Sequence, residues 1–442
     1  MLPALRRDPI GVFVETAQRF GDVAYLKIGP QHAYLVTRPE HIRHVLQDNA
    51  RNYHKSPFYD KLKPSVGEGL LTSEDSFWLR QRRMAQPAFH RERVAALAAV
   101  MVHAASETAA RWETAASRGE PLDVSDEMMR LTQTIVLRTL LGGDLGPFEG
   151  KLDQAWAFVN EYVGASFWSL GLMERLPTAR NRRFRRALGV LDGAVFHIIE
   201  KRRRAGREAD DLLSMLMFAR DEESGQAMTD KQLRDEVMTM LLAGHETTSL
   251  ALAWTWYLLA RHPDVRQRLD AELDMVLGGR PPAYNDLANL PYARMIIEEA
   301  MRLYPPAWGL SRRAVAPDEI GGYHLPRGWL VFIMPFVMHR HRAYWDDPER
   351  FDPGRFTPER NAARPKFVYM PFGGGPRQCI GNQFAMIEAH LALASLAQRY
   401  RCDLVPGPPV EPWPLITLRP RHGIRMHIQR RRSRAPMDQA VG

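Results

Sequence analysis

The spacing of hydrophobic positions changes along the chain and divides it into regions of different structure. Before Asp75, short apolar runs such as VAYLKIG and HAYLVT predict strands, followed by a helix from about Glu40. From about Asp75 to Arg302 the apolar residues recur at helical spacing, which predicts mostly long helices. After Tyr304, short strands and turns lead to Cys379, followed by one more helix and a strand-like end. The pattern predicts a mainly α fold with a minor β region.

The 442 residues show no internal repeat, no low-complexity tract and no Gly/Ser-rich linker. We therefore expect a single domain over residues 1–429 and a basic, disordered tail over residues 430–442. The longest apolar run, Val237 to Ala260, carries His245, Glu246 and three hydroxyl residues at its centre. Because an acid at the centre of a membrane span is costly, this run predicts a buried helix. The first residues contain neither a signal sequence nor a membrane anchor.

The segment FGGGPRQCIG, Phe372 to Gly381, places a cysteine among four glycines, a proline and an arginine. Its glycines predict a tight loop, and the helical pattern from Asn382 puts Cys379 at a helix N-terminus, where a thiolate is favoured. A thiolate can be a nucleophile, a redox centre or an axial metal ligand. Cys402 is the only other cysteine, which excludes zinc and iron–sulfur sites built on several thiolates but allows haem. The alternative is a small buried hydrophobic residue.

Arginine dominates the charge of the chain, which is +9, from 60 Lys and Arg against 51 Asp and Glu. The runs KRRRAGR and RRRSR are typical of solvated faces or tails, and no nucleic-acid motif accompanies them. We therefore expect no nucleic-acid binding, whereas an acidic protein partner fits this charge. Two cysteines give no disulfide framework, so a reducing cytoplasm is expected.

The cysteine loop has the form F-x-x-G-x-R-x-C-x-G, through Phe372, Gly375, Arg377, Cys379 and Gly381. This form resembles the haem-binding loop of the cytochrome P-450 mono-oxygenases. The resemblance implies the P-450 fold, with haem b (iron protoporphyrin IX) between the long central helix and the helix after the cysteine. It makes Cys379 the ligand of the iron and the other four residues part of the haem site, with Arg377 pairing with a propionate.

Three further motifs resemble motifs of the same family. Two of them lie in the central helix and in the helix that ends at Tyr304. In AGHETT, Gly244 opens space beside the central helix, and Thr247 can bond back to the carbonyl of Ala243. We expect Ala243 and Gly244 to belong to the haem site. The resemblance implies that Glu246 and Thr247 line the oxygen-binding groove and help to deliver protons. Glu299 in EAMRLYPP matches the first member of a Glu-Arg-Arg cluster, whose other members are Arg302 and Arg355, and we assign this cluster a role in folding.

The remaining matches concern the haem propionates. Trp78 and Arg82 share one helix face and resemble the W-x-x-x-R motif that contacts propionates. Arg312 is at the position where the family commonly places another propionate partner, but Arg313 is adjacent, and the choice between them stays open. These matches extend over nearly the whole chain.

The resemblance implies insertion of one atom of O₂ into a C–H or C=C bond. It implies electrons from a ferredoxin or flavodoxin with an NAD(P)H-dependent reductase, because no flavin or iron–sulfur domain is appended. Arginines such as Arg80 and Arg83 fit an acidic electron donor. Apolar segments near Lys55, Trp156, Pro306 and Glu411 predict a medium-sized hydrophobic substrate: a fatty acid, terpenoid or steroid. The alternatives are a peroxide-driven peroxygenase and a haem sensor or carrier. We expect a cytoplasmic monomer.

Overall fold

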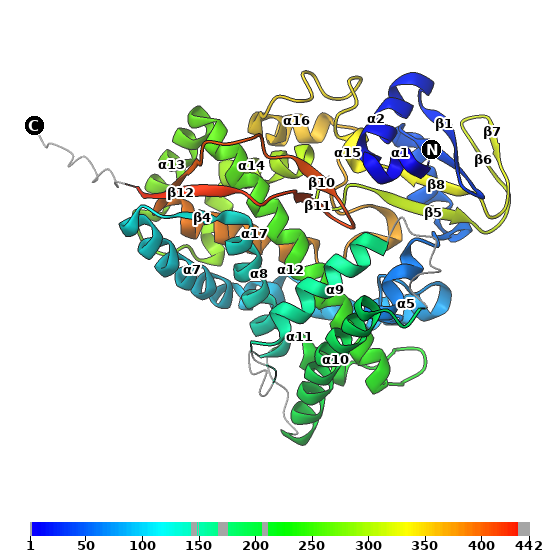
Figure 1. The fold of residues 1–442 in the computed structure, drawn as a ribbon, viewed down its shortest axis with the longest axis horizontal. Helices are drawn as coiled ribbons and strands as arrows, with labels where there is room; N and C mark the ends of the chain where they lie inside the picture. The colour runs from blue at the N-terminus through cyan, green and yellow to red at the C-terminus, as the bar shows by residue number, and fades with distance from the viewer. Residues whose placement is uncertain (1, 143–147, 149, 167–175, 206–210, 432–442) are drawn as a thin grey trace, which may run out of the picture.

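The computed structural model describes residues 2–142, 148, 150–166, 176–205 and 211–431. It shows a helical body with a smaller β region beside the N-terminus (Figure 1). This confirms the mainly α fold with a minor β region. The N-terminal half carries α1 (Leu2–Arg7), α2 (Pro9–Phe20), α3 (Pro39–Arg43), α4 (Lys63–Val66), α5 (Asp75–Ala85), α6 (Arg91–Ala96), α7 (Ala98–Arg118), α8 (Val124–Leu141), α9 (Leu152–Ser166), α10 (Ala179–Ala205) and α11 (Leu212–Phe218).

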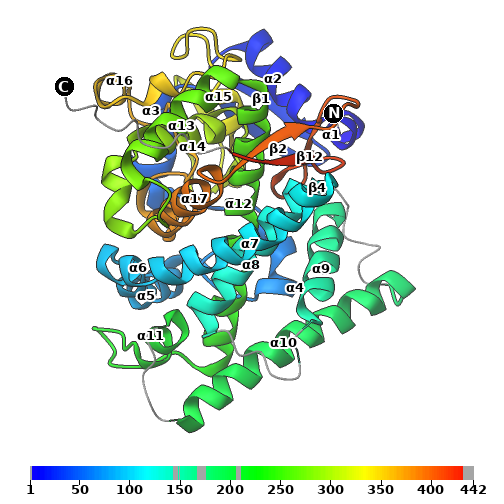
Figure 2. The ribbon, with the colours of Figure 1, turned by 90° about the vertical axis from the view of Figure 1, so that its left-hand side faces the viewer.

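The C-terminal half adds the central helix and the helices that pack around it. These are α12 (Asp230–Arg261), α13 (Pro263–Leu277), α14 (Pro291–Leu303), α15 (Pro335–Met338), α16 (Pro358–Ala363) and α17 (Asn382–Ala397). Figures 1 and 2 place α10 along the lower edge of the molecule, whereas α12 passes through its centre.

The largest sheet has the strand order β1-β2-β8-β5-β3, with β2 and β8 parallel and the other neighbours antiparallel. Its strands come from both ends of the chain, so it joins the N-terminal region to the segment before the cysteine loop. They are β1 (Val23–Ile28), β2 (Gln31–Val36), β3 (Tyr53–Lys55), β5 (Leu310–Ala314) and β8 (Leu330–Ile333).

Three smaller sheets lie outside this one. A three-stranded sheet has the order β4-β12-β9, and two hairpins pair β6 with β7 and β10 with β11. The strands are β4 (Pro121–Asp123), β6 (Asp318–Ile320), β7 (Tyr323–Leu325), β9 (Tyr400–Leu404), β10 (Pro412–Pro414), β11 (Leu418–Pro420) and β12 (Arg425–Arg430).

The C-terminal boundary differs from the prediction. Strand β12 includes Arg430, and Arg431 pairs with Asp270 and Asp274 of α13. The ordered part therefore extends two residues beyond the predicted boundary at residue 429. The rest of the predicted tail, residues 432–442, lies outside the described residues.

Helix α12 is buried on nearly all sides, as the long apolar run predicts. It begins with a capping box, in which Thr229 and Gln232 bond each other's backbone amides, and it ends before Pro263, which cannot continue a helix. Helices α8, α10, α14 and α17 pack against it. Because neighbours cover most of its length, its polar residues have to bond within the protein or face a cavity.

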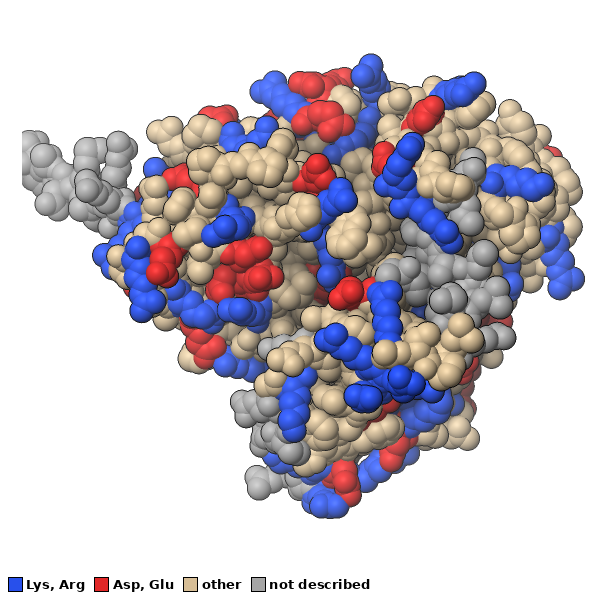
Figure 3. All heavy atoms as spheres, in the orientation of Figure 1, with Lys and Arg blue, Asp and Glu red and all other residues tan. Residues whose placement is uncertain are grey.

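Much of the basic run at the end of α10 is neutralised within the chain. Arg202, Arg203 and Arg204 form ion pairs with Asp211, Asp230 and Glu200 respectively. Figure 3 shows many blue Lys and Arg side chains over the lower part of the molecule, where α9 and α10 lie. These pairs give the run a structural explanation that requires no external partner.

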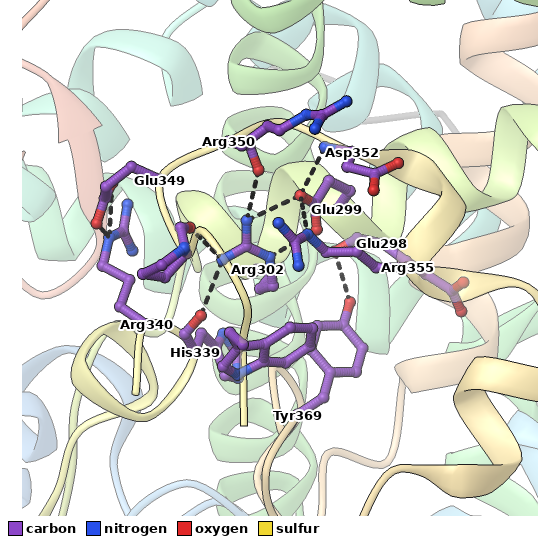
Figure 4. A network of polar contacts seen from close by, with 12 residues as sticks. Glu298, Glu299, Arg302, His339, Arg340, Glu349, Arg350, Asp352, Arg355 and Tyr369 are labelled. Atoms are coloured by element: carbon purple, nitrogen blue, oxygen red, sulfur yellow. Dashed lines mark hydrogen bonds and ion pairs between the residues drawn. The ribbon is translucent and has the colours of Figure 1, made fainter. Parts of the chain in front are cut away.

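A buried ion pair within α14 is also bonded to the segment before the cysteine loop (Figure 4). Glu299 and Arg302 are both completely buried, and the guanidinium of Arg302 donates two hydrogen bonds, of 2.6 and 2.8 Å, to the carboxylate of Glu299. The same carboxylate accepts the backbone amide of Asp352 at 2.9 Å, and Arg355 lies 3.4 Å from it. The predicted Glu-Arg-Arg cluster is therefore present.

Arg302 also holds three backbone carbonyls of the following segment. It donates to the carbonyl oxygens of His339, Pro348 and Arg350 at 2.6–3.0 Å. A single side chain therefore bonds three carbonyl groups of a segment that has little regular structure.

We expect Arg302→Met to lower the free energy of unfolding by about 3–5 kcal/mol, because the buried carboxylate of Glu299 would lose the guanidinium that donates two hydrogen bonds to it. Urea unfolding of the cofactor-loaded protein measures the change. The control is Arg38→Met, which breaks an exposed 2.6 Å pair with Asp22 and should cost less than about 1 kcal/mol. Equal losses for the two variants would contradict a special role for the buried cluster.

Candidate active site

A cavity of about 340 Å³, here called the central cavity, lies between α12 and the cysteine loop with α17. Helices α5, α8 and α14, strand β5 and the loop after α4 complete its walls. Most of its lining is aliphatic or aromatic, and the polar side chains concentrate at a few positions. Such a space suits a large apolar ligand with a small number of fixed polar contacts.

Cys379 faces this cavity from the loop that the sequence singled out. Its amide donates to the carbonyl oxygen of Phe372 at 3.0 Å, which closes the loop. The thiol is open to the cavity, although protein encloses that cavity on most sides. Burial raises the pKa of the Cys379 thiol, whereas the Gly381 amide and Arg82 act in the opposite direction.

The five motif residues of the loop do not share one role. Phe372, Arg377, Cys379 and Gly381 line the cavity, but Gly375 does not. Gly375 has a φ of +68°, and a Cβ there would lie 1.8 Å from the carbonyl oxygen of Leu46. This glycine therefore seats the loop against the N-terminal region, a contact that its sequence position did not reveal.

Cationic side chains gather at one end of the cavity. Arg377 stacks on the ring of Trp78 at 4.4 Å, and Arg82 donates to the carbonyl oxygen of Gln378 at 2.9 Å. Arg312 is buried and lines the cavity, whereas Arg313 is exposed and does not. The structure thus favours Arg312 in the choice that the sequence left open.

Lys55 belongs to the same cationic end, and the sequence analysis did not assign it this role. Burial, together with Arg377 and Arg312, lowers its pKa to about 7. Glu74 offsets part of this charge through an ion pair with Arg377. Burial is the largest cause of this shift, and the two arginines add to it. Because Lys55, Arg312 and Arg377 lie together, this end of the cavity suits a ligand with carboxylates.

The opposite wall is the middle of α12. Ala243, Gly244 and Thr247 line the cavity there, and the Thr247 hydroxyl donates to the carbonyl oxygen of Ala243 at 2.7 Å, as expected. A Cβ on Gly244 would lie 3.2 Å from Val136 of α8, so the glycine lets these two helices approach closely. The AGHETT motif thus forms the wall of the cavity opposite the cysteine.

Glu246 does not line the cavity, contrary to the expectation from the sequence. Its carboxylate is buried among Asn160, Thr417 and Arg419, with bonds of 2.6 and 2.8 Å from the guanidinium. Successive residues of a helix point about 100° apart, so Thr247 can face the cavity while Glu246 faces a neighbouring strand. The pairing with Arg419 explains how a carboxylate is accommodated there.

Comparison with known proteins decides the family. The sequence model of the family "Cytochrome P450" matches residues 2–425. Cyclooctatin synthase of Streptomyces melanosporofaciens is 41% identical over 94% of this chain and 90% of its own length. Pentalenene oxygenase of Streptomyces avermitilis is 35% identical over 95% of this chain and 92% of its own length.

The chain is a cytochrome P450. A crystal structure of the cytochrome P450DA heme domain agrees with it in fold, with a TM-score of 0.87 and 28% identity over 97% of this chain and 94% of that one. A second relative from Streptomyces melanosporofaciens, cyclooctat-9-en-7-ol 5-monooxygenase, is 38% identical over 91% of this chain and 87% of its own length. The protein is accordingly a P450 mono-oxygenase with haem as its cofactor.

The residues of the central cavity fit a haem. A thiol lies on one wall, the centre of α12 forms the other, and the cationic end holds Lys55, Arg312 and Arg377 with Glu74 as a partial counter-charge. Two propionate carboxylates would neutralise the excess of positive charge at this end. In the part of the P450 that the structure describes, no helix is long and apolar enough to cross a membrane.

The P450 also contains a buried acid that the sequence analysis did not consider. Glu388 of α17 is completely buried beside Thr248, and burial raises its pKa well above the ordinary range. Thr248, Ala385 and Ala389 around it line the cavity. In sequence this glutamate resembles any residue of an amphipathic helix, and only the packing of α17 on α12 reveals that it is buried.

The substrate-facing segments were only partly predicted. The segment after Lys55 contributes Tyr59, Leu70 and Leu71 to the cavity, and the segment from Pro306 contributes Pro306 and Ala307. The described part of the segment from Trp156 packs elsewhere, and residues 167–173 of it lie outside the described residues. The segment from Glu411 does not line the cavity either. Instead, α8 and α11 supply walls that the sequence analysis missed, with Val136, Thr139, Leu140 and Leu212.

Proposed function

We propose that this P450 inserts one atom of O₂ into a C–H or C=C bond of a terpenoid, with electrons supplied by separate redox proteins. The observation that supports this most directly is the central cavity, which has Cys379 on one wall, Thr247 on the other and mainly apolar side chains around them. Oxygen, the cofactor and a hydrophobic substrate can meet in such a space.

The choice of a terpenoid rests on the relatives and on the walls. Three relatives are a cyclooctatin synthase, a cyclooctat-9-en-7-ol 5-monooxygenase and a pentalenene oxygenase. The cavity walls of Leu70, Met240, Ile297 and Met301 offer dispersion contacts to a hydrocarbon skeleton, without charged groups among them. This favours a terpenoid over the fatty acids and steroids that the sequence left open.

When bound, the haem supplies the activation of O₂, and the protein controls position and protons. We assign Cys379 as the ligand of the iron and Phe372 and Gly381 as its neighbours in the haem site. Trp78, Arg82, Arg312 and Arg377 are assigned to the propionates, and Lys55 joins them. The Thr247 hydroxyl, fixed by the Ala243 carbonyl, is the proton-handling group at the distal wall. Glu246 can contribute only indirectly, because Arg419 holds its carboxylate outside the cavity.

Both cysteines are free thiols, and Cys402 is buried. Oxidation of Cys379 would remove the ligand that we assign to the iron. We therefore place the protein in the cytoplasm, where thiols stay reduced.

The proposed function is tested with the haem-loaded protein, a surrogate ferredoxin and reductase, and a panel of cyclic terpenes, fatty acids and steroids. We expect terpenes to shift the haem absorption band and to give hydroxylated or epoxidised products that depend on reductant and O₂. Cys379→Ser should lose both the red-shifted band of the reduced carbon-monoxide complex and the products, whereas Cys402→Ser should keep both. Turnover with hydrogen peroxide alone at the same rate would favour the peroxygenase, and binding without product would favour a sensor or carrier.

Thr247→Ala should separate oxygen consumption from product formation. Loss of the hydroxyl removes a positioned proton donor, an effect of up to about 10²-fold where water cannot substitute. We expect less product and more hydrogen peroxide per reductant consumed, with substrate binding unchanged. The control is Thr255→Ala, which removes the same type of hydroxyl, bonded to Ala251 at 2.7 Å in the same helix but outside the cavity. Full coupling in Thr247→Ala would contradict the assignment.

The electron donor is proposed to dock at a surface groove of about 720 Å³ that reaches Pro376 of the cysteine loop. The arginines expected from the sequence are mostly engaged: Arg83 pairs with Asp221 and Glu223, and Arg80 donates to the Ala227 carbonyl. Arg93 and Arg220 also line the groove, together with Asp221 and Glu222. Opposite charge on a ferredoxin or flavodoxin would speed its encounter with this face.

Arg93→Glu should slow reduction of the haem by an acidic ferredoxin several-fold at low salt, and the difference from the unmodified protein should shrink as salt screens the charges. Stopped-flow reduction rates at increasing ionic strength measure this. Arg327→Glu makes the same charge change on the exposed turn between β7 and β8, outside the groove, and should have little effect. Equal slowing in both variants would indicate a response to net charge and not docking at the groove.

A further inference from the structure

A short loop, residues 67–73, crosses the first turns of α12 and forms part of the cavity wall. It follows α4 and precedes α5, and it contains turns but no helix or strand of its own. Leu70 and Leu71 line the central cavity. Because no ladder of backbone bonds supports this loop, its position depends on individual contacts.

Two adjacent carboxylates of α12 hold the backbone amides of this loop. Asp235 accepts the amide of Glu68 at 3.0 Å, and Glu236 accepts the amide of Leu70 at 3.1 Å. Asp235 is also paired with Lys231 and Arg234. Its charge is therefore compensated by its own helix, and its bond to the loop is one of several.

Glu236 has far fewer partners than Asp235. It is 1% exposed, and its Oε1 atom has no hydrogen-bond partner among the described residues. Burial raises its pKa to about 8. A buried carboxyl group with an unsatisfied oxygen is costly, so fold stability alone does not explain why it is present. Its one strong contact is the amide of Leu70.

The same residue is also held through its carbonyl group. The ammonium group of Lys55, at the end of β3, donates to the carbonyl oxygen of Leu70 at 3.1 Å and to that of Ser73 at 2.6 Å. Arg377 of the cysteine loop also donates to the carbonyl oxygen of Ser73, at 3.3 Å. Leu70 is therefore fixed at its amide by α12 and at its carbonyl by the cationic end of the cavity.

Gly69 brings the loop into direct contact with α12. A Cβ at this position would lie 2.2 Å from the hydroxyl of Thr239 and 2.6 Å from the carbonyl oxygen of Asp235. Thr239 itself lines the cavity. The backbone of the loop thus lies against the helix with no room for a side chain, which is the arrangement that the bond from Leu70 to Glu236 requires.

We propose that Glu236 is a positioning residue for substrate selection: its bond to the Leu70 amide fixes Leu70 and Leu71 as a wall of the cavity and so limits the size of the molecule that fits. The inference rests on the proposed role of the central cavity as the substrate site. It identifies Glu236 as the residue that fixes one dimension of this cavity.

The test uses the haem-loaded, full-length protein and two measurements. Hydrogen exchange of the peptide that contains residues 67–73 reports on the loop, and absorbance titrations with imidazole and with the bulky azole clotrimazole report on the space above the iron. Glu236→Ala should speed exchange at the Leu70 amide roughly tenfold. It should also strengthen clotrimazole binding relative to imidazole by about five- to tenfold, with imidazole affinity unchanged. Glu236→Gln keeps an acceptor oxygen and should restore both values.

Gly69→Ala tests the same wall without altering Glu236, and it decides the question if Glu236→Ala does not fold. Its Cβ should push the loop from α12 and reproduce both changes, whereas Gly189→Ala on α10, where the Cβ meets nothing within 4 Å, should reproduce neither. Unchanged exchange in both loop variants overturns the proposal. Faster exchange with an unchanged azole ratio also overturns it, because the loop would then not set the cavity, yet the terpenoid mono-oxygenase assignment would stand.

Discussion

The site depends on one constraint, namely that a single sulfur must be presented to the cavity by a loop that has almost no regular structure. Contacts with distant parts of the chain hold this loop in position. Gly375 packs against the carbonyl of Leu46, and Arg377 donates hydrogen bonds to Glu74 and to the carbonyl of Ser73. Arg82 of α5 donates a hydrogen bond to the carbonyl of Gln378. The N-terminal region therefore positions a cysteine that lies about three hundred residues later. The large sheet has the same effect, because its strands come from both ends of the chain.

The residues that the sequence identified correctly share a physical property: their roles follow from local backbone geometry. Thr247 bonds to the residue four positions earlier, and Glu299 and Arg302 pair one turn apart. The fold class followed in the same way, from spacing along each segment. Such contacts can be predicted from spacing along the sequence, because helix periodicity brings residues three or four positions apart together.

The residues that the sequence misassigned or missed depend on contacts across the fold. Glu246 points toward Arg419 on β11, with which it forms an ion pair, and no local sequence pattern indicates this pair. Lys55 reaches the cavity because β3 pairs with β5, which places it opposite Arg312. Gly375 matches a family motif, but a glycine is needed there because a Cβ would collide with the carbonyl of Leu46. A motif names the residues of a site but does not fix where each side chain points.

Positive charge at the cavity gathers at one end of it. Lysine and arginine gather where carboxylates of a cofactor would lie, and burial lowers the pKa of Lys55 to about 7. Two buried acids, Glu236 and Glu388, are held at α12 and α17, where burial raises their pKa. Neutral acids can be buried at lower cost than carboxylates, and they still offer oxygens and a proton. Charged side chains thus occupy one end of the cavity, whereas aliphatic and aromatic side chains make up most of its lining.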